Sequence, residues 1–290
     1  MKKALIQLHV AVFLAGFTGI LGRLIDLNEG LLVWYRMLIT VITLGFIMGF
    51  QKQITRLHIK DTLRVVSVGA VIALHWVTFY GSIKYSNVSI ALVCFSSIGF
   101  FTAIFEPIIL KRRFEWRELA LGLLCITGIY LIFNFNPQYK TGIIIGLVSA
   151  LLAVCFSIFN KSLVGRIPVK TVTFYEMGGG WLVLTVLMPF YLKLFPTDYI
   201  FPSISDWGWL LILAWLCTVW AMLLQLSSLR KLSTFTSNLT YNLEPVYGIL
   251  LAFIVFKENE NLSGGFYYGL ALILLSVFWQ MWRIYRYQKH

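Results

Sequence analysis

Long apolar runs separated by short polar connections make up most of the chain. Ten runs can be marked, at residues 4–21, 31–50, 65–81, 88–110, 119–133, 141–163, 172–191, 207–226, 236–256 and 266–284. Most come near the roughly 20 residues that an α-helix needs to cross about 30 Å of hydrocarbon. The run at 119–133 is short, so we expect that helix to gain a turn at either end. The pattern predicts an all-α integral membrane protein with ten transmembrane helices.

The connections and the composition support this class. The longest connection, "FPTDYIFPSISD" at 195–206, has two prolines and no apolar period, and no connection has room for a soluble domain. The chain of 290 residues is 59% hydrophobic and only 12% charged, whereas soluble domains carry roughly 25% charged residues. The start, "MKKALIQLHVAVFLAG", resembles a secretory signal peptide, but its apolar run continues to Leu21 without a clear A-x-A cleavage site. We therefore interpret it as the first helix.

The basic residues predict the orientation. With the N-terminus in the cytoplasm, the outer segments hold only Arg23, Lys84, Lys140, Lys193 and Lys257. Apart from Arg36, which lies inside a run, all other Lys and Arg fall in cytoplasmic segments. Positive residues concentrate on the cytoplasmic side of membrane proteins, so we expect both termini in the cytoplasm. The net charge of +12 is then explained by these short loops, without a nucleic-acid partner.

Neither cysteine nor histidine indicates catalysis or a metal site. Cys94, Cys125, Cys155 and Cys217 all fall inside apolar runs and form no C-x-x-C pair, which is typical of small packing residues. His9 and His75 lie far apart in the sequence. No H-E-x-x-H, G-x-S-x-G or glycine-rich phosphate loop occurs. We expect no cofactor, no metal and no catalytic residues.

Weak internal repetition divides the runs into five and five. With "SIKYSNVSIAL" (82–92) set against "LRKLSTFTSNL" (229–239), Lys84 matches Lys231 and Ser86 matches Ser233. With "VWYRM" (33–37) set against "TFYEM" (173–177), Arg36 falls on Glu176. Because five is odd, the second half enters the membrane from the opposite side. We expect an inverted repeat of residues 1–138 and 139–290, the arrangement of many secondary transporters, with the substrate near the midplane.

Several motifs resemble the EamA-domain group of the drug/metabolite transporter superfamily. They are "YSNVSIALVCFSS", "STFTSNLTYNLEPVYGILLAFIVFKE" ending at Glu258, "GFYYGLALILLSV" and "WYRMLIT". The resemblance covers nearly the whole chain, and the Glu244-Pro245 segment is its most specific part. Two departures are a longer turn in "FKENENLSGGFYYG" and basic residues at 111–113, where the family often has an acidic one. The resemblance implies a ten-helix bacterial carrier in the inner membrane, and it leaves the substrate open because the family carries many metabolites.

Arg36 is the first candidate site residue, because a charged guanidinium is costly in hydrocarbon. It lies about five residues inside its run, roughly 7–8 Å deep. One interpretation is that it snorkels to the outer interface, aided by Asp26 or Glu29. The other is that it faces the central cavity and binds a carboxylate or gates the entrance. Glu176 lies at the matching depth from the cytoplasmic side, so we expect no direct ion pair between them.

Glu244 is the second candidate, near the middle of the ninth run and beside Pro245. A buried carboxyl there could carry a proton, or it could bond to backbone groups that the proline frees. Asn238, Tyr241 and Asn242 precede it and could line the same face. On the third run, His75, Trp76 and Tyr80 could form a cavity wall, since residues 76 and 80 share a helix face, although packing explains them equally.

Two smaller expectations concern packing and capping. The triplet Gly178–Gly180 and the glycines at 16, 19 and 22 are expected to allow close helix contact. Asn160 is expected to cap the end of its helix.

The sequence favours a secondary active transporter of a small metabolite, such as an amino acid or a related compound, with protons as the expected coupling ion. An intramembrane lipid-modifying enzyme would need catalytic groups clustered at one membrane face. A non-transporting scaffold or sensor would need neither polar residues at the midplane nor a repeat. The direction of transport and the oligomeric state stay open.

Overall fold

The computed structural model describes residues 2–53, 55–111, 113–164, 166–229, 240 and 243–287, and these are helical with short connections. The helices of the first half are α1 (Lys2–Leu24), α2 (Glu29–Phe50), α3 (Ile59–Lys84), α4 (Val88–Phe95), α5 (Ile98–Leu110) and α6 (Trp116–Phe135). The second half has α7 (Lys140–Val164), α8 (Val169–Leu194), α9 (Ile204–Ala214), α10 (Ala221–Leu229), α12 (Glu244–Phe256) and α13 (Gly264–Tyr287). A π-helical turn, η2 (Trp215–Trp220), joins α9 to α10, and short 3-10 turns, η1 (Pro137–Tyr139) and η3 (Glu258–Asn261), occupy two connections.

Eight stretches of the described chain are long and apolar enough to cross a membrane. They are Lys3–Leu24, Glu29–Phe50, Ile59–Lys84, Val88–Leu110, Trp116–Phe135, Pro137–Asn160, Val169–Leu194 and Ile204–Leu224. Two further apolar helices, Glu244–Phe256 and Gly264–Trp279, are shorter. The fifth predicted helix gains residues at both ends, as expected. The membrane class is confirmed, and eight of the predicted spans have full-length counterparts.

The fourth predicted span is not one regular helix, which corrects the expectation for 88–110. It breaks between α4 and α5 at Ser96 and Ser97. The Ser97 hydroxyl donates to the Cys94 carbonyl (2.6 Å) and the Ser96 hydroxyl to the Leu92 carbonyl (3.3 Å). Such side-chain bonds compete with the main-chain ladder of a helix.

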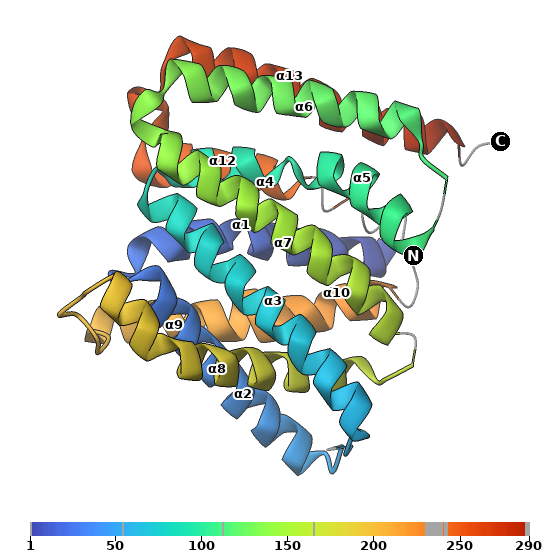
Figure 1. The fold of residues 1–290 in the computed structure, drawn as a ribbon, viewed down its shortest axis with the longest axis vertical. Helices are drawn as coiled ribbons and strands as arrows, with labels where there is room; N and C mark the ends of the chain where they lie inside the picture. The colour runs from blue at the N-terminus through green and yellow to red at the C-terminus, as the bar shows by residue number, and fades with distance from the viewer. Residues whose placement is uncertain are drawn as a thin grey trace.

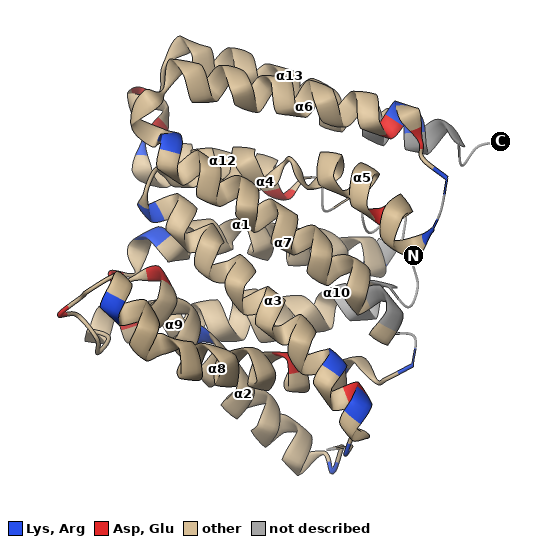
Figure 2. Cartoon of the chain, in the orientation of Figure 1, with Lys and Arg blue, Asp and Glu red and all other residues tan. Residues whose placement is uncertain are grey.

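The helices form one bundle in which α1 and α3 take central places. Helices α6 and α13 pack along each other at one edge, and α2 packs against α8 at the opposite edge (Figure 1). Helix α3 packs against α7 and α8, whereas α1 packs against α10 and α12. Helix α1 begins and α13 ends at the same end of the bundle (Figure 1), which we call the terminal end; the other is the far end. Charged residues gather at these two ends (Figure 2).

Glycine permits the closest of these contacts, as the sequence predicted. Gly69 of α3 lies against the backbone carbonyl of Glu176 on α8, and Gly180 of α8 lies against the carbonyl of Gly69. A Cβ at either position would overlap main-chain atoms that cannot rotate away. The predicted close contact holds for Gly179 and Gly180, but Gly178 has open space around its Cβ position.

Candidate functional site

Arg36 is buried among the helices of the bundle. Its side chain leaves α2, and the residue is only 3% exposed. Its Nε donates to the Thr218 hydroxyl (3.0 Å), and its Nη1 donates to the Tyr80 hydroxyl (2.7 Å). The guanidinium carbon lies 3.6 Å from the centre of the Trp76 ring. Glu29, one of the anions expected to aid snorkelling, instead accepts a hydrogen bond from the Tyr191 hydroxyl (2.8 Å).

These contacts can hold a buried charge without a carboxylate. A desolvated cation–π contact contributes about 2 kcal/mol or more, and a hydrogen bond to a charged group contributes about 1.5–3 kcal/mol. Together they offset an insertion cost of about 2.5–3.5 kcal/mol for an arginine at a helix centre. Both hydrogen-bond partners within the described part of the chain are hydroxyls, so no carboxylate of that part neutralises the guanidinium. The third nitrogen of the guanidinium, Nη2, donates to none of the described residues.

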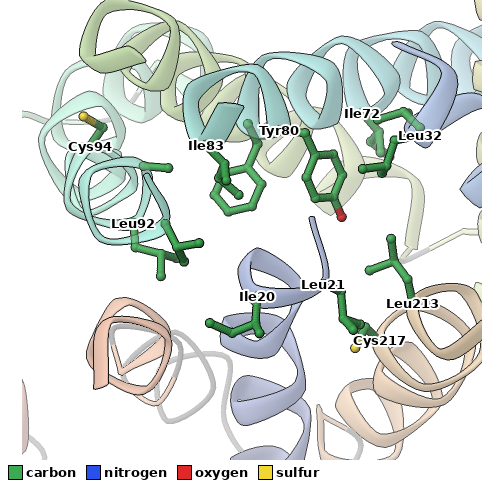
Figure 3. Close-up of a cluster of buried hydrophobic side chains, with 14 of the residues drawn as sticks. Ile20, Leu21, Leu32, Ile72, Tyr80, Ile83, Leu92, Cys94, Leu213 and Cys217 are labelled. Atoms are coloured by element: carbon green, nitrogen blue, oxygen red, sulfur yellow. The ribbon is translucent and has the colours of Figure 1, made fainter. Parts of the chain in front are cut away.

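Trp76 and Tyr80 form one face of α3 beside Arg36, which confirms their predicted shared face. Tyr80 is fully buried, and its ring lies directly over Gly22 of α1. Figure 3 shows its hydroxyl pointing away from α3, toward the side where Leu213 and Cys217 lie. The aromatic pair therefore connects the charged group on α2 to the centre of the bundle.

Thr218 completes this cluster, and the sequence reasoning missed it. It lies in the π-helical turn η2, is 1% exposed, and donates its hydroxyl to the Leu213 carbonyl five residues earlier (3.0 Å). Single π turns inside α-helices occur frequently at functional sites. No motif in "WLCTVW" marks this turn, so nothing in the sequence could have singled out Thr218.

His75 lies on another face of α3 and is not bonded to Arg36. Its Nδ1 lies 3.0 Å from the Ser149 carbonyl and 2.9 Å from the Ser149 hydroxyl on α7. Its ring stacks on Phe95, with centroids 5.5 Å apart, and lies beside Phe156. The structure thus places His75 in an aromatic layer between α3 and α7.

Glu176 is buried elsewhere, in the part of α8 that lies toward the terminal end of the bundle. It is 1% exposed, and its carboxyl is hydrogen-bonded by Asn160 of α7. Asn160 was expected to cap its helix, but α7 continues to Val164, so this side chain instead extends from the helix toward α8. No ion pair joins Arg36 to Glu176 among the described contacts, in line with the expectation.

The remaining predicted site residues lie in and beside the ninth run. Glu244 begins α12 and is followed by Pro245 in the first turn. Its backbone carbonyl lies against Gly16 of α1. The predicted residues Asn238, Tyr241 and Asn242 lie outside the described residues.

A polar network joins the helices at the far end. Asp206, which is 1% exposed, accepts hydrogen bonds from the Asp26 amide (3.0 Å) and the Tyr199 hydroxyl (2.6 Å). The Tyr35 hydroxyl donates to the carbonyl of Ile200 in the connection before α9 (3.3 Å). Lys84 donates to the carbonyls of residues 25 and 27. The turn between α1 and α2 is therefore tied to α3 and to the first turn of α9.

Glu258 is part of the same end and caps α4. It accepts from the amides of Val88 (3.0 Å) and Ser89 (2.8 Å), from the Ser89 hydroxyl (2.6 Å) and from Arg23 (3.3 Å). A carboxylate at a helix N-terminus satisfies free amides and complements the helix dipole. The sequence singled out Glu258 only through the resemblance and assigned it no partner.

Comparisons with known proteins identify the class of protein to which this chain belongs. A model of the EamA-like transporter family matches residues 2–134 and again residues 140–282. The chain is 23% identical over 291 residues to "Uncharacterized transporter YetK" of Bacillus subtilis, covering 95% of this chain and 86% of the relative. It is 25% identical over 144 residues to an "Uncharacterized transporter" of Haemophilus influenzae, covering 47% of each, so that match spans about half of the relative's length.

The fold is shared with a solved crystal structure at a TM-score of 0.64, with 16% identity and coverage of 96% of both chains. The family model covers both halves of the sequence, and the buried polar cluster lies inside a bundle of membrane-spanning helices. This chain is therefore a membrane transporter of the EamA-like transporter family.

Proposed function

We propose that the protein is a secondary active transporter that moves a small carboxylate-bearing metabolite, such as an amino acid or a related compound, by alternating access. The observation that carries this proposal is Arg36. A guanidinium buried at 3% exposure with two hydroxyls and an indole ring as partners keeps an unneutralised positive charge in a low-dielectric region. A carboxylate from a bound molecule would neutralise it and accept from its planar donors.

We further propose ten spans built as an inverted repeat of residues 1–138 and 139–290. The family model matches each half separately. The helix pairs also correspond, since α3 packs on α7 as α10 packs on α1. Helices α5 and α12 end alike, at Lys111 and Lys257 in the left-handed conformation (φ 51° and 52°).

The charge bias supports an orientation in the bacterial inner membrane with both termini in the cytoplasm. The far end then faces outward, and the network around Asp206 and Glu258 closes it in this conformation. Exchange of substrate with the outside would require these contacts to break. In alternating access, the same site becomes accessible from each side in turn.

The proposed binding region extends from the Arg36 cluster to the other predicted residues. Trp76 and Tyr80 would pack on the apolar part of a substrate, in the way that aromatic side chains line ligand sites. The sequence also assigned Asn238, Tyr241, Asn242, Glu244, His75 and Glu176 to this region, with protons as the coupling ion. The first five remain proposed substrate-binding residues, whereas Glu176, which is buried apart from the Arg36 cluster, is proposed to bind the coupling proton instead.

A comparison of metabolites tests the function. Cells producing the wild type and cells producing Arg36→Ala at equal membrane levels would be compared for metabolites inside and outside. We expect small carboxylates to be redistributed by the wild type only. Each candidate would then be tested by counterflow into liposomes containing the purified protein. A redistribution confined to cations, or identical in both strains, would contradict the proposal, and altered lipids without flux would favour the enzyme alternative.

A further inference from the structure

Three buried oxygen atoms near the terminal end of the bundle have no hydrogen-bond partner among the residues that the structure describes. They are Glu176 Oε1, Thr173 Oγ1 and Asn160 Oδ1. Glu176 is 1% exposed and Thr173 is 4% exposed. Buried polar atoms in folded proteins are nearly always paired, so an unpaired group indicates a missing proton, ion or water. Three such oxygens in one place make a group that is rich in acceptors.

The backbone brings these side chains together. Thr173 and Glu176 are three residues apart on α8, which places them on neighbouring positions of one helix face. Asn160 reaches the same carboxyl from α7. Behind them, Gly69 of α3 lies directly against the backbone of Glu176. The carboxyl is therefore held between helices and shielded from water.

No charged side chain among the described residues faces this carboxyl. On α2, Arg36 is bonded to Tyr80 and Thr218. On α3, Arg64 pairs with Asp61 (3.7 Å), and His75 bonds to Ser149 on α7. Helix α7 presents the neutral Asn160. A carboxylate in this position would thus carry a buried charge without a counter-ion, which costs far more than its neutral form.

We infer that Glu176, with Asn160 and Thr173, is the proton-binding site of the transport cycle, separate from the Arg36 cluster; this rests on the proposed transport function. A proton taken from water on Oε1 converts an unpaired acceptor into a donor. The new O–H can bond to the free Asn160 Oδ1 or to Thr173 Oγ1. When the site opens to the terminal end, water can solvate the carboxylate, and the proton leaves without any redox change.

Glu244, the carboxyl to which the sequence pointed, is placed less well for this role. It begins α12 and is followed by Pro245, which has no amide to donate, and among the described residues α12 carries no unpaired buried side-chain oxygen. Glu176 lies inside α8, seven residues after the helix begins at Val169, where the main-chain amides are already used by the helix. A group that must exchange a proton needs a stable neutral form, and the interior of α8 favours one.

The test separates the exchange of substrate across the membrane from the coupling of transport to protons. Proteoliposomes would hold the wild type, Glu176→Gln, Glu244→Gln or the control Glu29→Gln, whose amide oxygen can still accept from Tyr191. Two fluxes would be measured for a carboxylate found in the metabolite comparison. One is counterflow without a pH gradient, and the other is accumulation driven by a pH gradient.

We expect Glu176→Gln to keep counterflow within about threefold and to lose at least tenfold of the pH-driven accumulation. Glu29→Gln should behave like the wild type, and in Glu244→Gln the ratio of pH-driven accumulation to counterflow should stay at the wild-type value. In infrared pH-difference spectra of purified protein, the band of a protonated carboxyl should disappear in Glu176→Gln. Asn160→Leu, which keeps the carboxyl, should shift the midpoint of the pH dependence.

Full pH-driven accumulation by folded Glu176→Gln would overturn the inference, as would accumulation driven by a sodium gradient alone. If Glu176→Gln does not fold, an unshifted midpoint in Asn160→Leu overturns it. A wild type without counterflow would instead contradict the transport function itself. The two failures are therefore distinguishable.

Discussion

At the residue scale, the chemistry of Arg36 depends on its geometry as well as on its charge. The guanidinium is flat, its carbon lies over the indole of Trp76, and it uses separate nitrogens for Thr218 and Tyr80. A lysine ammonium is a compact point charge that cannot copy this planar fork of donors. The two interpretations left open by the sequence therefore differ in what they predict for a conservative replacement.

Arg36→Lys should lower transport by about tenfold or more, equivalent to ~1.4 kcal/mol, while membrane levels stay normal. The loss arises because the three donors of an ammonium are arranged as a tetrahedron and cannot copy the planar donors that a guanidinium offers to a carboxylate. Arg64→Lys is the matched control, since Arg64 is exposed and pairs only with Asp61 at 3.7 Å. Counterflow of the identified substrate measures transport by both variants. Normal transport by Arg36→Lys would show that Arg36 only anchors α2.

At the element scale, the contact between α3 and α8 depends on the absence of a side chain at Gly69. Gly69→Ala would place a Cβ against the carbonyl of Glu176, which is main chain and cannot move alone. Overpacking of this kind costs typically about 1–3 kcal/mol. We expect a lower thermal midpoint for the purified protein in detergent. Gly178→Ala, with nothing within 4 Å of its Cβ position, should leave the midpoint unchanged, and equal midpoints for both variants would contradict the packing argument.

The cap on α4 is a second feature of this scale. Glu258 is 3% exposed and accepts from two amides, one hydroxyl and Arg23. Glu258→Ala should cost about 1.5–3 kcal/mol, because it leaves buried donors unpaired. Glu260→Ala, exposed in the same 3-10 turn, is the control. Unfolding of the two purified variants by denaturant measures their stability. Indistinguishable unfolding curves for the two variants would show that the cap does not stabilise the protein.

At the scale of the whole molecule, the proposed topology makes a simple prediction. Reporters fused at the C-terminus and inserted in the connection 195–203 should lie on opposite sides of the membrane, because α13 ends at the terminal end and α9 begins at the far end. A phosphatase reporter active only outside and a fluorescent reporter active only inside would be used at each position. Both positions reporting the same side would rule out the arrangement.

Much of this fold could be predicted from the sequence, because hydrocarbon imposes rules on each span separately. A helix must be about 20 apolar residues long and must satisfy its own backbone, so the runs, their approximate ends and the charge bias are readable one segment at a time. The helix period likewise placed Trp76 and Tyr80 on one face. The run of glycines at 178–180 predicted close helix contact, and this contact occurs at 179 and 180.

The partners across helices were decided only by the tertiary structure. Thr218 reaches Arg36 through a π turn that no residue pattern marks, and Asn160, expected to cap its own helix, instead reaches Glu176 on α8. The break between α4 and α5 was likewise not predicted, although Ser96 and Ser97 stand at it in the sequence. The physical reason is that membrane insertion depends on the composition of each segment, whereas packing depends on which small residues let two backbones approach. The composition of each segment therefore predicts which residues enter the membrane, whereas the packing of the bundle sets which buried polar groups meet there.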